Sequence, residues 1–165
     1  FKESCSGKAK QYKVTDVMLP FVRNKADLII LREALREYGC EDIRIFAKIE
    51  NMTGVEHLEE LIPYCDYIVI ARGDLGNAMP LSQLPRIQAH IARVCRKHNK
   101  DFMIVTQMLD SMIKNPYPTR AEVNDIYHAV TQGASTLMLT GETAHGKYPV
   151  EAMKMLVDTA EESIL

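Results

Sequence analysis

The stretch IRIFAKI at residues 43–49, followed by a helical pattern over residues 54–64, decides the fold class of this sequence. Apolar and β-branched residues dominate the first segment, as is typical of a buried strand. In the second segment, Val55, Leu58 and Leu61 recur at the spacing of one helix face. The two segments together form one βα unit.

The same alternation recurs along the whole chain. Short apolar strands that alternate with amphipathic helices require parallel pairing, right-handed crossovers and helices outside the sheet. The predicted fold class is therefore α/β. Because an eight-stranded barrel usually needs about 250 residues, we expect a partial (β/α)8 TIM barrel of about five βα units; an open doubly wound sheet is the alternative. Strands are predicted at 14–21, 43–49, 67–71, 102–106 and 136–140, helices at 26–39, 54–64, 84–98, 121–132 and 150–163, and a loop at 72–80.

Length and composition fit one ordinary globular domain. The chain has 165 residues, of which 47% are hydrophobic and 25% are charged, values that argue against disorder and coiled coils. Low-complexity tracts and linkers are absent, so we expect a single domain over residues 1–165. The chain begins without an initiator Met, and we expect it to be a piece of a longer protein.

Charge and hydropathy argue against nucleic-acid and membrane partners. The formal net charge is −2, and Lys and Arg are scattered among Asp and Glu, so no basic field attracts a polyanion. No apolar stretch approaches the roughly 18 residues of a membrane span, and the first residues lack the apolar core of a signal peptide. We expect a cytoplasmic protein.

Cysteine and methionine positions predict structural roles. No C-x-x-C pair is present, so the cysteines are expected to be free thiols. Five methionines near the end of the chain are expected to fill the core. The cysteines are Cys5, Cys40, Cys65 and Cys95, and the methionines given this role are Met108, Met112, Met138, Met153 and Met155.

Polar and charged residues gather at the predicted carboxyl ends of the strands. In a parallel α/β sheet these ends lie on one face, where barrel enzymes keep their sites. The sequence therefore predicts a functional site at this face. The segments concerned are 48–51, 72–76, 106–107 and 140–143.

Lys48, Glu50 and Asp74 are the strongest candidates for chemistry. Lys48 and Glu50 are two residues apart on a strand, so they project to the same side. Glu50 and Asp74 offer carboxylate oxygens, which are hard ligands suited to Mg²⁺. The alternative interpretation is a simple Lys48–Glu50 pair that caps the core.

Two glycines and two threonines complete the candidate site. Gly73 and Gly76 bracket Asp74, so the backbone can bend and present N–H groups to an anion such as a substrate carboxylate; a turn in which Asp74 caps a helix is the alternative. Thr106 and Thr140 end two strands with hydroxyls that can hold a substrate or relay a proton. Each threonine can instead be a helix cap.

Five runs stand in the order and spacing of one known family. They are FAKIEN (46–51), ARGDLG (71–76), TQMLDSM (106–112), PTRAE (118–122) and LTGETA (139–144). Together they resemble pyruvate kinase, most strongly over residues 14–162. The resemblance implies the second half of the catalytic barrel of an enzyme that transfers a phosphoryl group from phosphoenolpyruvate to ADP, giving pyruvate and ATP.

The resemblance also implies the roles of individual residues. Glu50 and Asp74 look like ligands of Mg²⁺, for which Mn²⁺ can substitute, and Lys48 looks like the cation that stabilises charge on the phosphoryl group and the enolate. By similarity, the backbone N–H groups of Gly73 and Asp74 receive the substrate carboxylate. Thr106 then contacts substrate near the enolate carbon that is protonated.

The position of Thr140 is occupied by a serine in the family's proton relay, and threonine keeps the hydroxyl. Departures at Pro20, Tyr117 and residues 77–80 predict a changed site rim and a changed subunit contact. We expect a homo-oligomer, since the parent family forms tetramers.

Much of the family's site has no counterpart here. Nothing in the sequence matches the first three barrel strands, which bring a phosphate-binding Arg and the ligands of K⁺. The family's lid and regulatory domains are also unmatched. We therefore expect K⁺ to act in the parent enzyme through ligands outside this chain, and we expect little or no kinase activity from the 165 residues alone.

Two other functional classes remain open. A Mg²⁺-dependent lyase or aldolase on a related pyruvate barrel would hold an enolate at Glu50 and Asp74 without a nucleotide. A non-catalytic interaction module could have inherited the barrel half. Dependence on ADP separates the first class from a kinase.

Overall fold

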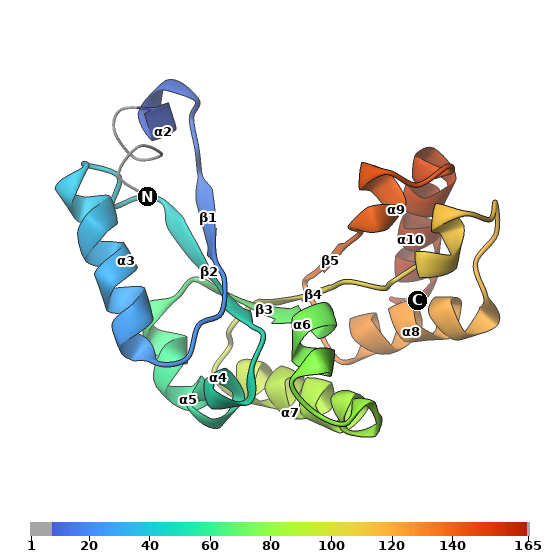
Figure 1. Ribbon diagram of the computed structural model, residues 1–165, viewed down its shortest axis with the longest axis horizontal. Coiled ribbons are helices and arrows are strands. Elements are labelled where there is room, and N and C mark those ends of the chain that lie inside the picture. The colour runs from blue at the N-terminus through green and yellow to red at the C-terminus, as the bar shows by residue number, and fades with distance from the viewer. Residues whose placement is uncertain (1–7, 165) are drawn as a thin grey trace.

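The computed structural model describes residues 8–164 as a five-stranded parallel sheet with helices along it (Figure 1). The strands follow one another in chain order, β1-β2-β3-β4-β5, and every neighbouring pair is parallel. Figure 1 shows the sheet bent into an open arc, with β1 at one end and β5 at the other. The predicted α/β class and partial barrel are confirmed, whereas an open doubly wound sheet would reverse its strand order part-way.

The elements alternate as the sequence predicts. The strands are β1 (Asp16–Leu19), β2 (Arg44–Ile49), β3 (Tyr67–Ala71), β4 (Phe102–Val105) and β5 (Thr136–Met138). The helices are α2 (Lys8–Gln11), α3 (Lys25–Glu37), α4 (Met52–Glu56), α5 (Leu58–Leu61), α6 (Arg72–Asn77), α7 (Leu84–Lys97), α8 (Arg120–Thr131), α9 (Gly141–Ala144) and α10 (Pro149–Glu162), with 3-10 turns η1 (Ile62–Tyr64), η2 (Leu81–Gln83) and η3 (Asp110–Ile113).

The two faces of the sheet have different surroundings. One face packs against the helices through residues such as Ile45, Ile68 and Ile104, each fully buried. The other face carries a smaller apolar cluster on the three central strands. This inner cluster comprises Phe46, Tyr67, Val69, Ala71, Met103 and Val105.

The observed elements differ from the predicted ones most at residues 54–64 and 72–80. The prediction of a loop over residues 72–80 was wrong for residues 72–77, because α6 begins directly after β3 and places Leu75 in the core, whereas residues 78–80 are irregular as predicted. The single helix predicted at 54–64 is divided into α4, α5 and η1. His57 leaves the α conformation between α4 and α5, with φ −97° and ψ 11°. In η1, Pro63 lacks the N–H that an α-helix would use.

The cysteine prediction is confirmed for the described residues. Cys40, Cys65 and Cys95 are free and buried, and Cys5 lies outside the described residues. Burial raises the pKa of Cys65 to about 11 and that of Cys95 to about 12. These two thiols therefore stay protonated and unreactive at neutral pH.

The methionine prediction holds only in part. Met108 and Met112 are buried, but Met153 on α10 is 46% exposed, so its assignment to the core was wrong. Met153 belongs to the solvent face of α10. Among the helices of residues 8–164, none has the length and apolar character needed to cross a membrane.

Candidate functional site

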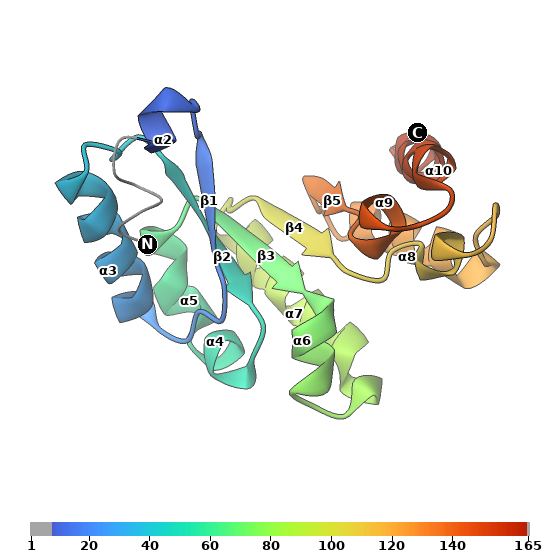
Figure 2. The ribbon, with the colours of Figure 1, turned by 45° about the horizontal axis from the view of Figure 1, so that its top comes forward.

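The carboxyl ends of β2 and β3 bring the predicted metal ligands to one edge of the sheet. In the β2–β3 ladder Ile49 lies opposite Ile70, so Glu50 and the start of α6 follow at neighbouring strand ends. Figure 2 shows α6 continuing from the end of β3 at this edge, beside the loop that leaves β2. The structure therefore places Glu50 and Asp74 on adjacent elements.

Lys48 and Glu50 form a close ion pair on the inner face of β2. Strand alternation puts them on the side of Phe46, which belongs to the inner cluster. Lys48 Nζ lies 2.7 Å from Glu50 Oε1, and the two side chains are 25% and 1% exposed. The predicted projection to one side is confirmed, and the carboxylate is the buried partner of the two.

The second oxygen of Glu50 fixes the backbone at the end of β1. Phe21 N donates to Glu50 Oε2 at 2.7 Å, and Phe21 takes a left-handed φ of 52°. An aromatic residue seldom adopts such a φ, so this hydrogen bond helps to hold it. Both carboxylate oxygens of Glu50 therefore have a partner inside the chain.

Asp74 and Gly73 lie in the first turn of α6. Asp74 is exposed, and the residue before the helix makes no side-chain cap. The first N–H groups of a helix have no partner within the helix, so the N–H groups of Gly73 and Asp74 point outward from its start. The alternative in which Asp74 caps a following helix does not hold, because Asp74 is inside α6.

Thr106 follows β4 in a left-handed turn, and its side chain packs closely against Gly73. The φ values of Thr106 and Gln107 are 77° and 54°. Such a φ is unusual for any residue other than glycine, and most of all for the β-branched Thr106. A Cβ atom on Gly73 would lie 3.0 Å from Thr106 Cγ2 and 3.7 Å from Thr106 Oγ1. Glycine thus allows the Thr106 side chain to approach the start of α6, and the structure brings these two predicted site residues together.

Arg72 holds this turn from the other side, and sequence reasoning missed it. Its Nε and Nη2 atoms donate to Thr106 O at 3.1 and 2.8 Å, and Nη2 also donates to Gln107 O at 3.0 Å. Nη1 donates to Asp125 Oδ2 on α8 at 2.6 Å. Arg72 is only 8% exposed. An arginine placed directly after a buried strand, where a buried charge must be paired, was the signal available in the sequence.

Thr140 lies at the start of α9 and contacts a buried carboxylate. Glu142 Oε2 accepts from Thr140 N at 2.8 Å and from Thr140 Oγ1 at 3.4 Å, and Glu142 Oε1 accepts from Leu109 N at 3.0 Å. Thr140 occupies the cap position but makes no side-chain cap bond. The helix-cap alternative for Thr140 is therefore not observed.

Burial and hydrogen bonding act on Glu142 in opposite directions. Glu142 is 1% exposed, and burial alone would raise its pKa. The backbone hydrogen bonds, from Leu109 and Thr140 among others, outweigh burial and lower the pKa below its usual range. Glu142 therefore remains a carboxylate at neutral pH, and it was the second functional-site neighbour that sequence reasoning missed.

The carboxylates present fit a divalent cation such as Mg²⁺. Glu50 and Asp74 both supply hard oxygen atoms, and Mg²⁺ commonly takes one or two protein carboxylates, with waters and substrate oxygens as its other ligands. Within residues 8–164 no cluster of three or more His, Cys, Asp or Glu side chains suits a metal ion. The two carboxylates therefore suit a cation that takes its other ligands from substrate and water better than they suit a structural metal site made of protein ligands alone.

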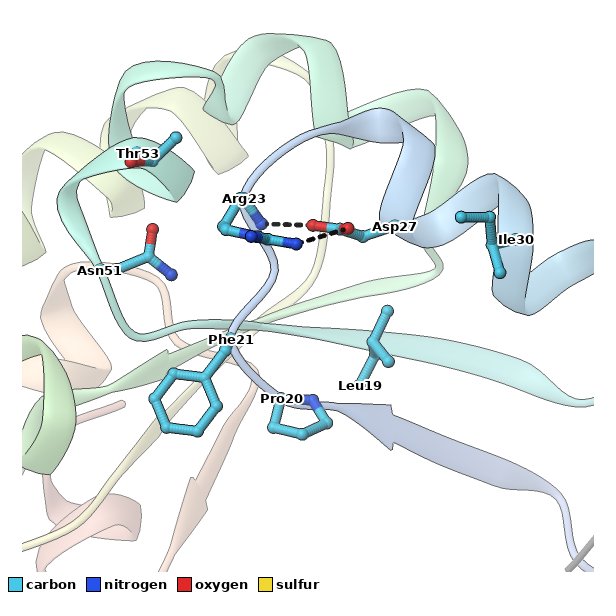
Figure 3. Close-up of a pocket in the computed structure, with 8 residues that line it drawn as sticks. All are labelled: Leu19, Pro20, Phe21, Arg23, Asp27, Ile30, Asn51 and Thr53. Atoms are coloured by element: carbon cyan, nitrogen blue, oxygen red, sulfur yellow. Dashed lines mark hydrogen bonds and ion pairs between the residues drawn. The ribbon is translucent and has the colours of Figure 1, made fainter. Parts of the chain in front are cut away.

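A pocket of about 580 Å³ lies beside this edge, and the predicted segment 48–51 reaches it through Asn51. Figure 3 shows Arg23 and Asp27 facing each other there, with an ion pair of 3.4 Å. Leu19 and Pro20 line the pocket from β1 and its end. Phe21 also lines it, so the backbone held by Glu50 forms one wall of this pocket.

A family model described as pyruvate kinase, barrel domain, matches residues 7–153. The chain belongs to the pyruvate kinase family. Residues 8–13, where the sequence resemblance was thin, fall within the match, while 154–162 fall outside it. The matched range includes every predicted site residue from Lys48 to Thr140.

Individual pyruvate kinases agree with this assignment. The enzyme of Clostridium acetobutylicum is 43% identical over 147 residues, 89% of this chain and 31% of that protein. The enzyme of Thermotoga maritima is 45% identical over 145 residues, 88% of this chain and 31% of that protein. The crystal structure of a pyruvate kinase from Cryptosporidium parvum superposes with a TM-score of 0.93 at 34% identity, covering 98% of this chain and 34% of that one.

This chain thus spans about a third of the length of the pyruvate kinases it matches. Five parallel strands with their helices make up a partial TIM barrel of this family.

Proposed function

We propose that this chain is the second half of a catalytic barrel, one domain over residues 1–165, in an enzyme that transfers a phosphoryl group from phosphoenolpyruvate to ADP. The observation that carries the proposal is the Lys48–Glu50 pair of 2.7 Å on the inner face of β2, with the exposed carboxylate of Asp74 in the helix that follows the neighbouring strand. A cation and two carboxylates at one strand edge match a reaction in which charge spreads over phosphoryl and enolate oxygens.

The metal part of the proposal concerns Glu50 and Asp74. These residues would hold Mg²⁺ or Mn²⁺, which when bound supplies positive charge to oxygens of the substrate. Lys48, now paired with Glu50, would then be free to place its ammonium against the phosphoryl group. K⁺ is proposed for the parent enzyme, with its ligands outside this chain.

The remaining residues would orient the substrate and move a proton. The N–H groups of Gly73 and Asp74 would receive the substrate carboxylate at the start of α6. Thr106, packed against Gly73, would contact substrate near the carbon that is protonated. Thr140 would complete a relay, and its contact with the Glu142 carboxylate at 3.4 Å supports an oriented hydroxyl.

The proposal places the enzyme in the cytoplasm as a homo-oligomer. An apolar groove of about 480 Å³ on α10 is lined by Val150, Met153 and Val157, among others, and these three side chains are 75%, 46% and 44% exposed. Exposed apolar side chains that recur on one helix face are typical of a protein interface. Tyr117, at 76% exposed, supports a second contact area.

A coupled assay for pyruvate tests this function. Protein isolated intact from its source is expected to form pyruvate from phosphoenolpyruvate only when ADP and a divalent cation are both present. Pyruvate formed from a keto acid without ADP would contradict the proposal and indicate a lyase. The 165-residue chain alone is expected to turn over far more slowly than about one per second, and a rate at or above that value would overturn this part.

A further inference from the structure

The guanidinium of Arg72 joins two strand ends and a helix. It donates twice to Thr106 O and once to Gln107 O after β4, and once to Asp125 on α8. The side chain is 9% exposed, whereas that of Asp125 is 33% exposed. The three donations to the carbonyl oxygens of Thr106 and Gln107 come from one rigid planar group, which fixes the turn more firmly than a flexible cation would.

The turn that Arg72 holds adopts a backbone conformation that its residues disfavour. Thr106 and Gln107 have consecutive left-handed φ values of 77° and 54°, and neither residue is glycine. Such conformations persist only where surrounding contacts determine them. Arg72 binds the carbonyl oxygens of both residues, so it is the contact best placed to determine this one.

The left-handed conformation of this turn determines the position of the Thr106 side chain. Thr106 Cγ2 would be 3.0 Å from a Cβ on Gly73, and Gly73 follows Arg72 directly. The backbone of Arg72 therefore starts the helix that presents the Gly73 and Asp74 N–H groups, while its side chain draws Thr106 against that helix. One residue sets the distance between the two parts of the site.

We propose that Arg72 is a positioning residue, which holds the Thr106–Gln107 turn left-handed and so sets the Thr106 side chain against the start of α6. This inference rests on the proposed function for the identity of the ligand, an enolate-like dianion beside a divalent cation. Its claim about the turn is independent of that function. Lysine is not expected to replace Arg72, since an ammonium cannot span two carbonyl oxygens and a carboxylate in a fixed fork.

The first measurement concerns the turn itself in the 165-residue chain. A strong intraresidue HN–Hα Overhauser effect marks a left-handed residue, and we expect it at Thr106 and Gln107 in the wild type. In Arg72→Gln and Arg72→Lys we expect it to weaken at both residues. In Asp125→Asn it should remain, because the donations to the carbonyl oxygens are kept; Arg36→Gln, an exposed substitution on α3, is the matched control.

The second measurement uses Mn²⁺ and oxalate, a planar dianion that resembles an enolate. We expect oxalate to tighten Mn²⁺ binding in the wild type. Arg72→Gln should reduce this tightening roughly tenfold or more, as expected for loss of charge-assisted hydrogen bonds, with Mn²⁺ binding alone little changed. If Arg72 only stabilised the fold, Arg72→Gln would not weaken Mn²⁺ binding in the presence of oxalate while leaving binding of Mn²⁺ alone unchanged.

A second substitution tests the inference even if Arg72→Gln folds poorly. Glycine adopts positive φ readily, so Gln107→Gly in the Arg72→Gln background is expected to restore the left-handed turn and part of the oxalate effect. Retention of the left-handed signals in Arg72→Gln and Arg72→Lys would overturn the inference. If oxalate fails to tighten Mn²⁺ binding in the wild type, the proposed function fails, and the Overhauser signals still decide whether Arg72 holds the turn.

Discussion

Glu50 uses one carboxylate oxygen for Lys48 Nζ at 2.7 Å and the other for Phe21 N at 2.7 Å. A carboxylate on a side chain that is 1% exposed would be costly without these partners. The same pair supplies a cation and an anion to the inner face of the sheet. The Lys48–Glu50 contact therefore stabilises the fold and also supplies the charged groups of the proposed chemistry.

Removing Lys48 tests the structural part of that contact. Lys48→Met leaves the Glu50 charge without its cation and is expected to lower the free energy of unfolding by about 2 kcal/mol, below the 3–5 kcal/mol of fully buried pairs because Lys48 is partly exposed. Urea unfolding measures the loss. The double variant Lys48→Met/Glu50→Gln should recover most of it.

The control for this prediction is an exposed pair. Lys97 Nζ lies 3.0 Å from Glu59 Oε1 with side chains 64% and 58% exposed, so Lys97→Met should change stability little. Equal losses from Lys48→Met and Lys97→Met would contradict the account of Glu50.

Glu142 predicts a pH dependence of stability. Its pKa in the folded chain is lowered by hydrogen bonds that outweigh burial, so its contribution is fully present above the unfolded value of about 4.3. The contribution is lost as pH falls through the lowered pKa. Glu142→Gln should therefore reduce the free energy of unfolding by roughly 1–3 kcal/mol at pH 7, with a smaller difference from wild type at acid pH.

Denaturant titrations at several pH values check this expectation. Glu161→Gln, an exposed substitution on α10, should give a small difference that changes little with pH. A difference between wild type and Glu142→Gln that grows toward acid pH has the wrong sign and would refute the assignment.

Gly54 and Gly76 make a matched pair of helix glycines. A Cβ on Gly54 would lie 2.5 Å from Val22 O, a backbone atom that cannot easily move, whereas a Cβ on Gly76 would meet only Leu81 and Leu84 side chains at 3.6 Å. Gly54→Ala should destabilise by about 1–3 kcal/mol through overpacking. Gly76→Ala should stabilise by about 0.5–1 kcal/mol through helix propensity. Thermal unfolding of both variants measures these changes. Shifts of the melting temperature in the same direction for both variants would contradict the packing described.

Local patterns were enough to predict most of the fold. The strand at Tyr67–Ala71 was predicted with its observed bounds because its residues form a continuous apolar run, as is typical of a strand buried on both faces, and the structure buries all five. Helix α6 was missed because Gly73 and Gly76 are typical of a turn, although Leu75 between them is fully buried. Burial against the core outweighed the low helix propensity of glycine.

The candidate site was predictable where neighbours in sequence act together and where parallel strands end at one edge of the sheet. Lys48 and Glu50 are two residues apart, so strand alternation alone predicted that their side chains project to the same side of the strand. The partners of Arg72 lie 34 residues away at Thr106 and 53 residues away at Asp125, and no local pattern relates such positions. The left-handed turn at Thr106 depends on those distant contacts and could not be predicted either.

The most direct test of the central claim is an electron paramagnetic resonance titration of Mn²⁺ into the 165-residue chain, with and without oxalate. The account predicts one site whose affinity rises when oxalate is present, and a loss of binding of tenfold or more in both Glu50→Gln and Asp74→Asn, on the order of one charged ligand. Binding that is absent in the wild type, or unchanged in both variants, would contradict the claim that β2 and α6 carry the metal half of a phosphoenolpyruvate site.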